Sequence, residues 1–219
     1  MSYLYKEDKY SSHSRIIDLC NGSGTALDIG SSSGYIAKQL TNYTVYCIDI
    51  DKESIKNAKR YCKKAILGDI ESARLPKNKF DMIIAADILE HLKNPAKVLL
   101  KLRNSLKKNG KMIISVPNVA HLWIRINLLF GRFNYEKKGI LDKTHLRFYT
   151  LSSIKKELDK AGFRIIKIIP TPVPLPIINK AFAESNILNF VHKINNFFAH
   201  SFRRLLAFQF VIYVKKSRP

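Results

Sequence analysis

Small and acidic residues follow three successive apolar runs in the first third of the chain. Gly30 and Gly34 flank a Ser-rich turn after TALDI, Asp49 lies at the end of TVYCIDI, and Asp69 follows AIL. Glycine lets a backbone approach a ligand closely, and a carboxylate at such a place can accept hydrogen bonds from ribose hydroxyls. Asp49 comes 19 residues after Gly30, about the offset found in nucleotide-binding folds. Together the three positions indicate a nucleoside site.

These positions need a scaffold of alternating strands and helices. Short continuous apolar runs, typical of buried strands, alternate with stretches that carry apolar residues three and four apart, as helices do. The expected strands are 25–29, 44–50, 65–69, 80–86 and 111–116, and the expected helices are 14–20, 34–40, 52–64 and 96–108. Such alternation predicts an α/β fold with a parallel, doubly wound sheet and helices on both faces.

The second half of the chain is less regular. A helix is expected over 150–163, capped by Thr150 or Ser152, and strands are expected at 163–169 and 208–216. The stretch PTPVPLP that follows residue 169 should not be helical, because a residue before proline is pushed to extended conformations. From Ile187 to Leu205, apolar residues recur at helical spacing opposite basic ones, which predicts an amphipathic cationic helix.

The glycine turn does not match the motifs for dinucleotides or triphosphates. GxGxxG is absent, because Gly22 and Gly24 precede the strand without a third glycine and Gly30 and Gly34 have another spacing. A Walker A lysine is also missing. A nucleoside without a pyrophosphate therefore fits better. The alternative is a plain Ser/Gly corner, with acids at the strand ends for solubility.

Five stretches, LDIGSSSG, VYCIDID, LGDI, FDMIIAADILEHL and LKKNGKMIISVPN, resemble in order and spacing the motifs of class I S-adenosylmethionine-dependent methyltransferases. The resemblance covers roughly Ala26 to Asn118. The following stretch, as far as Ile154, further resembles a subgroup often met near glycan and lipid-linked sugar biosynthesis, and it is distantly similar to ubiquinone-type O-methyltransferases. The resemblance implies a Rossmann-like methyltransferase fold, a three-layer αβα structure with a mostly parallel, doubly wound, seven-stranded sheet.

The same resemblance implies S-adenosyl-L-methionine as the methyl donor and S-adenosyl-L-homocysteine as the product. It places around the methionine moiety Asp28, Gly30, Ser31 and Gly34. It places at the ribose and adenine Asp49, Ile50, Asp69 and Ile70. It places on the floor near the sulfonium Ala85, Ala86 and Asp87.

Ser32 departs from the family pattern, because it takes the place of the middle glycine in the usual GxGxG. Serine is small, and its hydroxyl could cap the helix that follows. We therefore expect donor binding to be retained, with affinity as the property that Ser32 affects.

Methyl transfer from a sulfonium is an in-line displacement, and positioning alone can lower such a barrier by about 7–11 kcal/mol. An alcohol acceptor also needs a base, for which histidine is the usual choice. His91 follows the fourth strand, so it is either this base or a group that packs or caps there. His145 lies in a dense patch, where Asp142 could orient it for catalysis; alternatively, the patch is a structural latch. Arg147, in the same patch, either holds an anionic acceptor or pairs with Asp142.

Metal and disulfide chemistry are not indicated. The remaining histidines, which show no ligand spacing, are His13, His121, His192 and His200. The three cysteines form no CxxC and leave an odd count, so neither a zinc site nor a disulfide framework is predicted. We expect no metal and a reduced, cytoplasmic setting.

The charge balance favours an anionic partner. The 38 Lys and Arg against 17 Asp and Glu give a formal net charge of +21, which suits a nucleic acid, a membrane surface or a phosphorylated substrate. A lysine-biased composition without a functional meaning is the alternative. The first 15 residues lack the apolar core of a signal peptide, and no apolar run approaches the roughly 20 residues of a membrane span. A cytoplasmic protein, or one peripheral to the inner membrane face, is expected.

The expected organisation is a single methyltransferase domain, residues 1–219. Its parts are an N-terminal arm (1–23), a cofactor-binding core (24–118), a substrate segment (119–150) and an amphipathic insertion before the last strand (171–207). Residues 186–206 would meet a membrane surface, pack on the sheet, or pair two subunits in a homodimer.

Three functions remain open. The first is O-methylation of a small molecule, namely a sugar or a lipid-linked or quinone-type precursor, which would be an anionic or lipid-linked acceptor. The second is RNA methylation, which the charge favours; however, SVPN follows the fifth strand and no (D/N)PPY-type motif follows the fourth, so nucleic acid is the weaker candidate. The third is a non-catalytic binding module that keeps the fold.

Overall fold

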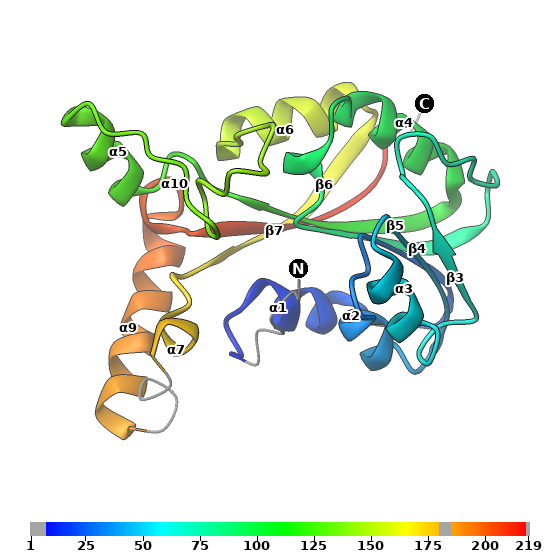
Figure 1. Cartoon of the computed structure of the whole chain (residues 1–219), viewed down its shortest axis with the longest axis horizontal. Helices are drawn as coiled ribbons and strands as arrows, with labels where there is room; N and C mark the ends of the chain where they lie inside the picture. The colour runs from blue at the N-terminus through cyan, green and yellow to red at the C-terminus, as the bar shows by residue number, and fades with distance from the viewer. Residues whose placement is uncertain (1–7, 180–184, 218–219) are drawn as a thin grey trace.

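The computed structural model describes residues 8–179 and 185–217. A seven-stranded sheet forms its centre (Figure 1). In order across the sheet, the strands are β3 (Lys64–Leu67), β2 (Tyr43–Asp49), β1 (Gly24–Ile29), β4 (Phe80–Ala86), β5 (Leu106–Pro117), β7 (Gln209–Lys216) and β6 (Phe163–Thr171). Neighbours pair in parallel except β7, which is antiparallel to both β5 and β6. The predicted mostly parallel, doubly wound, seven-stranded sheet is confirmed.

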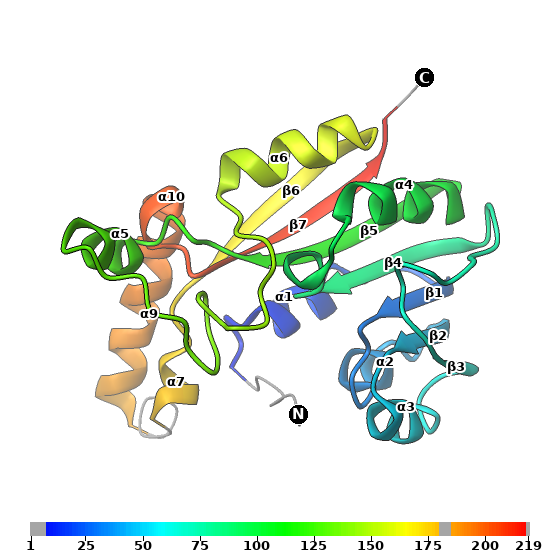
Figure 2. The same ribbon diagram turned by 45° about the horizontal axis from the view of Figure 1, so that its top comes forward.

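Helices cover both faces of the sheet, which gives three layers (Figures 1 and 2). The helices on one face are α1 (Ser12–Leu19), α2 (Tyr35–Gln39) and α3 (Lys52–Ala58), and those on the other are α4 (Pro95–Ser105) and α6 (Leu151–Lys160). Successive residues of β1 point to opposite faces of the sheet: Ala26 packs with α1 and α2, whereas Leu27 packs with α4 and α6. Continuous apolar strands are therefore explained by burial on both sides.

The caps of the two long helices follow the sequence signals. Asn94 accepts a hydrogen bond from the main-chain N–H of Lys97 at the start of α4. Thr150, one of the two predicted caps, begins α6 in a reciprocal capping box with Ser153. Each such cap satisfies main-chain donors that the first turn of a helix leaves without partners.

The predicted end of α4 at residue 108 is wrong, because the helix ends at Ser105 and β5 begins at Leu106. Leu106 is fully buried and pairs with Phe80 across a register shift between β4 and β5. Burial of this leucine against the sheet ends the helix three residues earlier than predicted.

The proline-rich stretch 170–176 also differs from expectation. β6 continues to Thr171, and a short helix, α7 (Leu175–Ile178), has Pro176 in its first turn. Proline is tolerated there because the first N–H groups of a helix have no intrahelical acceptor. The prediction of a stretch without helix was therefore wrong at its end.

Three further helices gather at the end of the sheet where β5 ends and β7 begins (Figures 1 and 2). They are α5 (Leu122–Leu129), α9 (Asn186–Ser201) and α10 (Arg203–Leu206). The predicted amphipathic helix is thus present as α9 and α10, with a break at Phe202. His192 on α9 contacts Asp8 of the N-terminal arm, with Nε2 and Oδ2 2.9 Å apart. None of the helices in the described part of the chain has the length and apolar content needed to cross a bilayer.

Candidate active site

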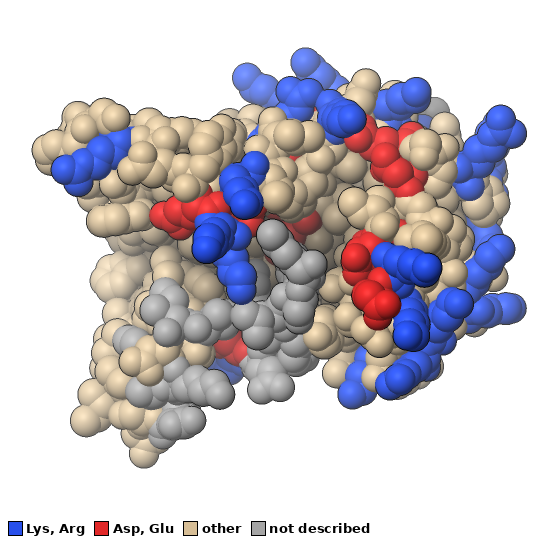
Figure 3. Space-filling model, viewed as in Figure 1, with Lys and Arg blue, Asp and Glu red and all other residues tan. Residues whose placement is uncertain are grey.

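A cavity of about 410 Å³ opens at the carboxyl ends of β1, β2, β3 and β4. The strand order reverses between β1 and β4, and ligands of doubly wound sheets bind at such a switch point. Nine of the eleven residues assigned to the cofactor from the sequence line the cavity: Asp28, Gly30, Ser31, Asp49, Ile50, Asp69, Ile70, Ala86 and Asp87. Figure 3 shows acidic side chains in several separate groups on one face of the molecule, with Lys and Arg side chains around them.

Gly34, one of the other two assigned residues, does not line the cavity. Its φ is +79°, and a Cβ atom there would lie 3.0 Å from the Cα atom of Ala58 in α3. The glycine therefore lets the turn pack closely against α3 and adopt a left-handed conformation. Ala85, assigned to the floor of the site, is fully buried in the core beneath the cavity.

Ser32 holds the carboxylate of Asp49 in the cavity wall. Its main-chain N–H donates to Asp49 Oδ2 over 2.7 Å, while that of Asp51 donates to Oδ1 over 2.9 Å. Two oxygens offer about four acceptor positions, so the fixed carboxylate can still accept from hydroxyls in the cavity. The expectation that Ser32 caps α2 is wrong, because the N-cap is Gly34 and no side chain bonds there.

Asp28 is a buried carboxylate of β1 that lines the cavity. It is 1% exposed, and its Oδ2 atom has no hydrogen-bond partner among the described residues. Burial, with a smaller effect from the charge of Asp49, raises the pKa of this carboxyl to about 7. A cationic group in the cavity would stabilise the ionised form, and the ammonium of a methionine moiety supplies such a charge. The residues present therefore fit S-adenosylmethionine.

Asp87 forms the floor of the cavity at the end of β4. It is buried and has a left-handed φ of +53°. Its main-chain N–H donates to the hydroxyl oxygen of Ser115 over 3.0 Å, and that hydroxyl donates to the Asp87 carboxylate. These bonds join the ends of β4 and β5, so that the floor is fixed by two central strands.

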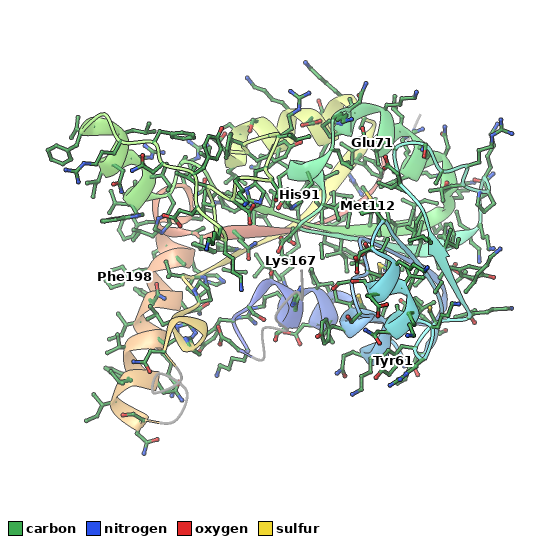
Figure 4. All side chains as sticks on the ribbon, in the orientation of Figure 1. Tyr61, Glu71, His91, Met112, Lys167 and Phe198 are labelled. Carbon is green, nitrogen blue, oxygen red and sulfur yellow. The ribbon has the colours of Figure 1, made fainter. Side chains whose placement is uncertain are left out.

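Two histidines meet at the mouth of the cavity. His91, labelled in Figure 4, lies in a 3-10 turn (Leu89–His91) and lines the cavity. The ring of His145 packs edge-on against it, with centroids 4.8 Å apart, but it does not line the cavity. Burial lowers the pKa of His145, so its imidazole is neutral at pH 7. The structure thus brings together the two predicted catalytic histidines.

Asp142 does not orient His145 through its carboxylate, as had been expected. Its Oδ1 atom accepts from the N–H and the hydroxyl of Thr144, over 2.8 and 2.7 Å, and these bonds lower the pKa of this carboxyl. The Nδ1 atom of His145 lies instead 2.9 Å from the carbonyl oxygen of Ile140. Asp142 therefore shapes the turn that carries His145.

Arg147 was expected to hold an anion or to pair with Asp142. Its Nη2 atom donates to the carbonyl of Lys93 over 2.7 Å, and no ion pair between described residues joins it to Asp142. The guanidinium thus ties the segment of His145 to the loop before α4.

Sequence reasoning missed several residues that line the cavity: His13, Tyr35, Ser54, Glu71 and Lys93. His13 comes from α1, and no spacing pattern relates it to the strand ends. Glu71 accepts from the main-chain N–H groups of Lys93 and Asn94, over 3.1 and 2.7 Å. Its place two residues after Asp69 was a signal, because both acids follow the same strand.

Comparison with known proteins identifies the family. A family model described as a methyltransferase domain matches residues 5–168. An uncharacterized protein of Methanocaldococcus jannaschii is 29% identical over 150 residues, 68% of each chain. The mitochondrial ubiquinone biosynthesis O-methyltransferase of Schizosaccharomyces pombe is 26% identical over 107 residues, which are 44% of this chain and 39% of that protein. The ubiquinone biosynthesis O-methyltransferase of Coxiella burnetii is 25% identical over 65% of this chain and 64% of its own length. The chain thus spans about two thirds or less of these relatives.

Solved structures share the fold. A SAM-dependent methyltransferase from Archaeoglobus fulgidus superposes with a TM-score of 0.64 at 20% identity, over 97% of this chain and 95% of that one. Phosphoethanolamine N-methyltransferase 2 of Haemonchus contortus, solved with S-adenosyl-L-methionine, gives 0.66 at 16% identity, over 94% of this chain and 52% of that one. The chain belongs to the methyltransferase domain family, whose model covers most of its length. It is an S-adenosylmethionine-dependent methyltransferase.

Proposed function

We propose that this enzyme methylates a hydroxyl oxygen of a small molecule, namely a sugar or a lipid-linked or quinone-type precursor. One observation carries the proposal: the imidazole of His91 lines the cavity after the fourth strand, and the ring of His145 packs edge-on against it. An alcohol must lose its proton as it attacks a methyl carbon, whereas a free amine attacks through its lone pair. Two relatives that methylate oxygen in ubiquinone biosynthesis agree with this assignment.

The residues of the cavity divide the work between binding and proton removal. Asp28 would pair with the ammonium of the donor, and Asp49 would accept from its ribose hydroxyls. The bound donor supplies an activated methyl group. Asp87 bounds the floor beside that methyl, and the acceptor's proton leaves at the His91–His145 pair.

We propose also that the acceptor is reached at an anionic membrane surface. The α5 helix and the residue after it expose Trp123, Leu129 and Phe130, which are 62%, 81% and 70% exposed. On α9, the strongly exposed apolar residues are Ile187, Phe190 and Phe197, at 77%, 61% and 65%. We call these six residues the apolar end surface; Phe198, labelled in Figure 4, lies beside it on α9.

Exposed basic residues accompany the apolar end surface: Arg125, Arg132, Lys193, Arg203 and Arg204. Apolar side chains among cations are typical of segments that lie in the interface of an anionic bilayer. The two helices reach the same end of the molecule, because buried Ile124 of α5 packs with Phe208 between α10 and β7. A lipid-linked acceptor would be presented at such a surface.

A labelled-donor assay tests the acceptor class. Purified enzyme is given S-adenosylmethionine with a labelled methyl group and, in separate reactions, sugars, quinols, lipid-linked sugars or RNA. The proposal predicts label in an ether of a small molecule, stable to mild base. Label in RNA, or in an amine of a small molecule, would contradict it.

A further inference from the structure

We propose that Glu90, His91 and His145 form a binding site for a divalent transition-metal ion, Zn²⁺ in the first instance, beside the donor cavity. One ligand atom of each residue can be chosen so that all three atoms lie within 4.8 Å of one another. The metal site itself stands on this geometry, whereas its role in the reaction rests on the proposed O-methylation.

The main chain brings the three residues together. Glu90 and His91 are neighbours in the turn after β4, and His145 returns from the segment before α6. The carbonyl oxygen of Glu90 accepts from the N–H groups of Leu146 and Arg147, over 2.8 and 3.0 Å. These two bonds fix one segment on the other, so the main chain itself holds the three residues as neighbours.

Both histidines hold Nδ1 against a main-chain carbonyl. The Nδ1 atom of His145 lies 2.9 Å from the carbonyl oxygen of Ile140, and that of His91 lies 3.2 Å from the carbonyl oxygen of Thr144. A carbonyl can only accept, so Nδ1 carries the proton in each ring and Nε2 keeps a lone pair. Histidines that bind metals are held in this way, with the second ring nitrogen donating to a carbonyl or carboxylate.

The charge and the donor set suit a divalent ion. Glu90 is 1% exposed and Asp87, three residues before it, is 5% exposed, and buried carboxylates are retained where cations balance them. Two imidazoles and one carboxylate are ligands that Zn²⁺ binds well, with open coordination positions left over. Zn²⁺ bonds of about 2.0–2.2 Å would draw the three ligand atoms closer together than they lie in the structure.

A metal ion here would activate the acceptor. Because His91 lines the cavity, an acceptor hydroxyl in the cavity could bind the ion, which would lower the pKa of that hydroxyl as it does for metal-bound water. The hydroxyl proton then passes to solvent. The new O–C bond forms as the S–C bond breaks, and the electron pair of the broken bond stays on sulfur. In this scheme His91 is a metal ligand, and this role replaces the proton removal at the His91–His145 pair that applies without a metal.

Metal titration of the full chain tests the site. Protein without a histidine tag is stripped with a chelator and dialysed, and Zn²⁺ is added in a calorimeter. We expect one ion per chain, and at least about tenfold weaker binding for Glu90→Gln and for His145→Ala, the range seen when parts of a metal site are removed. The matched control is His200→Ala, whose imidazole also contacts a carbonyl, that of Asn196, but lies outside the cluster; it should bind as wild type does.

A second readout uses the wild type alone, in case a variant fails to fold. Co²⁺ bound by two imidazoles and a carboxylate should give visible absorption bands that Zn²⁺ displaces at one equivalent. No saturable binding in the wild type, or binding that His145→Ala leaves unchanged in a folded protein, would overturn the metal site. S-adenosylmethionine binding, measured separately, keeps the two proposals apart, because loss of donor binding would overturn the proposed function and leave the metal result standing.

Discussion

The main-chain N–H of Ser32 lies 2.7 Å from Asp49 Oδ2, and Ser32 makes this bond with a φ of +46°. The residue that departs from the family's glycine pattern therefore keeps the left-handed conformation that glycine adopts without strain. Its N–H fixes the carboxylate assigned to the ribose. The substitution is accommodated by the backbone, and no capping bond from its side chain is involved.

Replacement of Ser32 by glycine should relieve this strain. A left-handed conformation costs a non-glycine residue about 1–2 kcal/mol, and glycine avoids this cost. Glycine also gives the unfolded chain more conformational freedom, which lowers the free energy of unfolding by about 0.4–1 kcal/mol and offsets part of the gain. We expect Ser32→Gly to raise the free energy of unfolding by up to about 1 kcal/mol in urea denaturation. Donor affinity should be no weaker. Donor binding tenfold weaker than in the wild type would show that the serine side chain itself takes part.

The free energy of unfolding should depend on pH through the titration of Asp28. Its carboxyl pKa is about 7 in the folded protein and about 3.9 in an unfolded chain. Between these values the folded state holds the proton and the unfolded state does not, so the free energy of unfolding falls as pH rises. The stabilisation is fully present below about pH 4 and is lost by about pH 7, at up to about 1.4 kcal/mol per pH unit. Urea denaturation from pH 4 to pH 8 measures this slope.

The variant Asp28→Asn should remove that slope, because an amide does not titrate in this range. A steep slope that persists in the variant would assign the titration to another group. Donor binding adds a second measurement: affinity of the wild type should rise with pH through about 7, as the carboxylate that pairs with the ammonium ionises. That rise should be absent from Asp28→Asn.

The histidine pair should govern turnover and leave donor binding alone. Proton removal or metal-assisted activation both require His91, and loss of a group of this kind lowers rates by about 10²–10⁴-fold. We expect His91→Gln to lower kcat in that range, with a donor affinity within about threefold of the wild type. The control is His200→Gln, on the exposed face of α9. Turnover unchanged in His91→Gln would remove the pair from the reaction.

The apolar end surface should bind anionic vesicles. In flotation, the wild type should rise with vesicles rich in phosphatidylserine or phosphatidylglycerol, and less so with neutral ones. Phe190→Ser together with Phe197→Ser should reduce recovery, since both side chains are mostly exposed and their loss should spare the fold. A matched pair of serines at two exposed lysines on the opposite end, Lys59 and Lys77, is the control.

Equal flotation of the wild type and the Phe190/Phe197 variant would contradict a membrane role for this surface. Light scattering on the same two proteins then tests whether a second copy of the chain covers this surface. A dimer in the wild type that the variant dissolves would assign the surface to a second copy of the chain.

The mostly parallel, doubly wound sheet and most of the donor cavity could be predicted because the causes are local. Continuous apolar strands need cover on both faces, and the carboxyl ends of parallel strands share an edge, so Gly30, Asp49 and Asp69 had to converge. The end of α4 could not be predicted in the same way. It depends on the pairing of Leu106 with Phe80, which no sequence pattern near Leu106 indicates.

The acceptor side was predicted in part. His91 and His145 were each singled out, but they stand 54 residues apart in the chain, and no spacing rule relates them. What joins them is the carbonyl of Glu90, which accepts from the main chain after His145. Because His145 is so far from Glu90 and His91 in the sequence, their cluster could not be predicted, and a metal was not expected. His13 was missed for a similar reason, since α1 reaches the cavity only through tertiary packing.

The measurement that tests the account most directly is calorimetry of S-adenosylmethionine with the wild type and with Asp49→Ala. We predict one donor per wild-type chain. Because Asp49→Ala removes charge-assisted hydrogen bonds of about 1.5–3 kcal/mol each, we predict affinity at least about tenfold weaker in the variant. The surface variant Asp159→Ala should bind as the wild type does. A wild type that does not bind the donor, or an Asp49→Ala variant that binds it equally well, would contradict the assignment of this cavity.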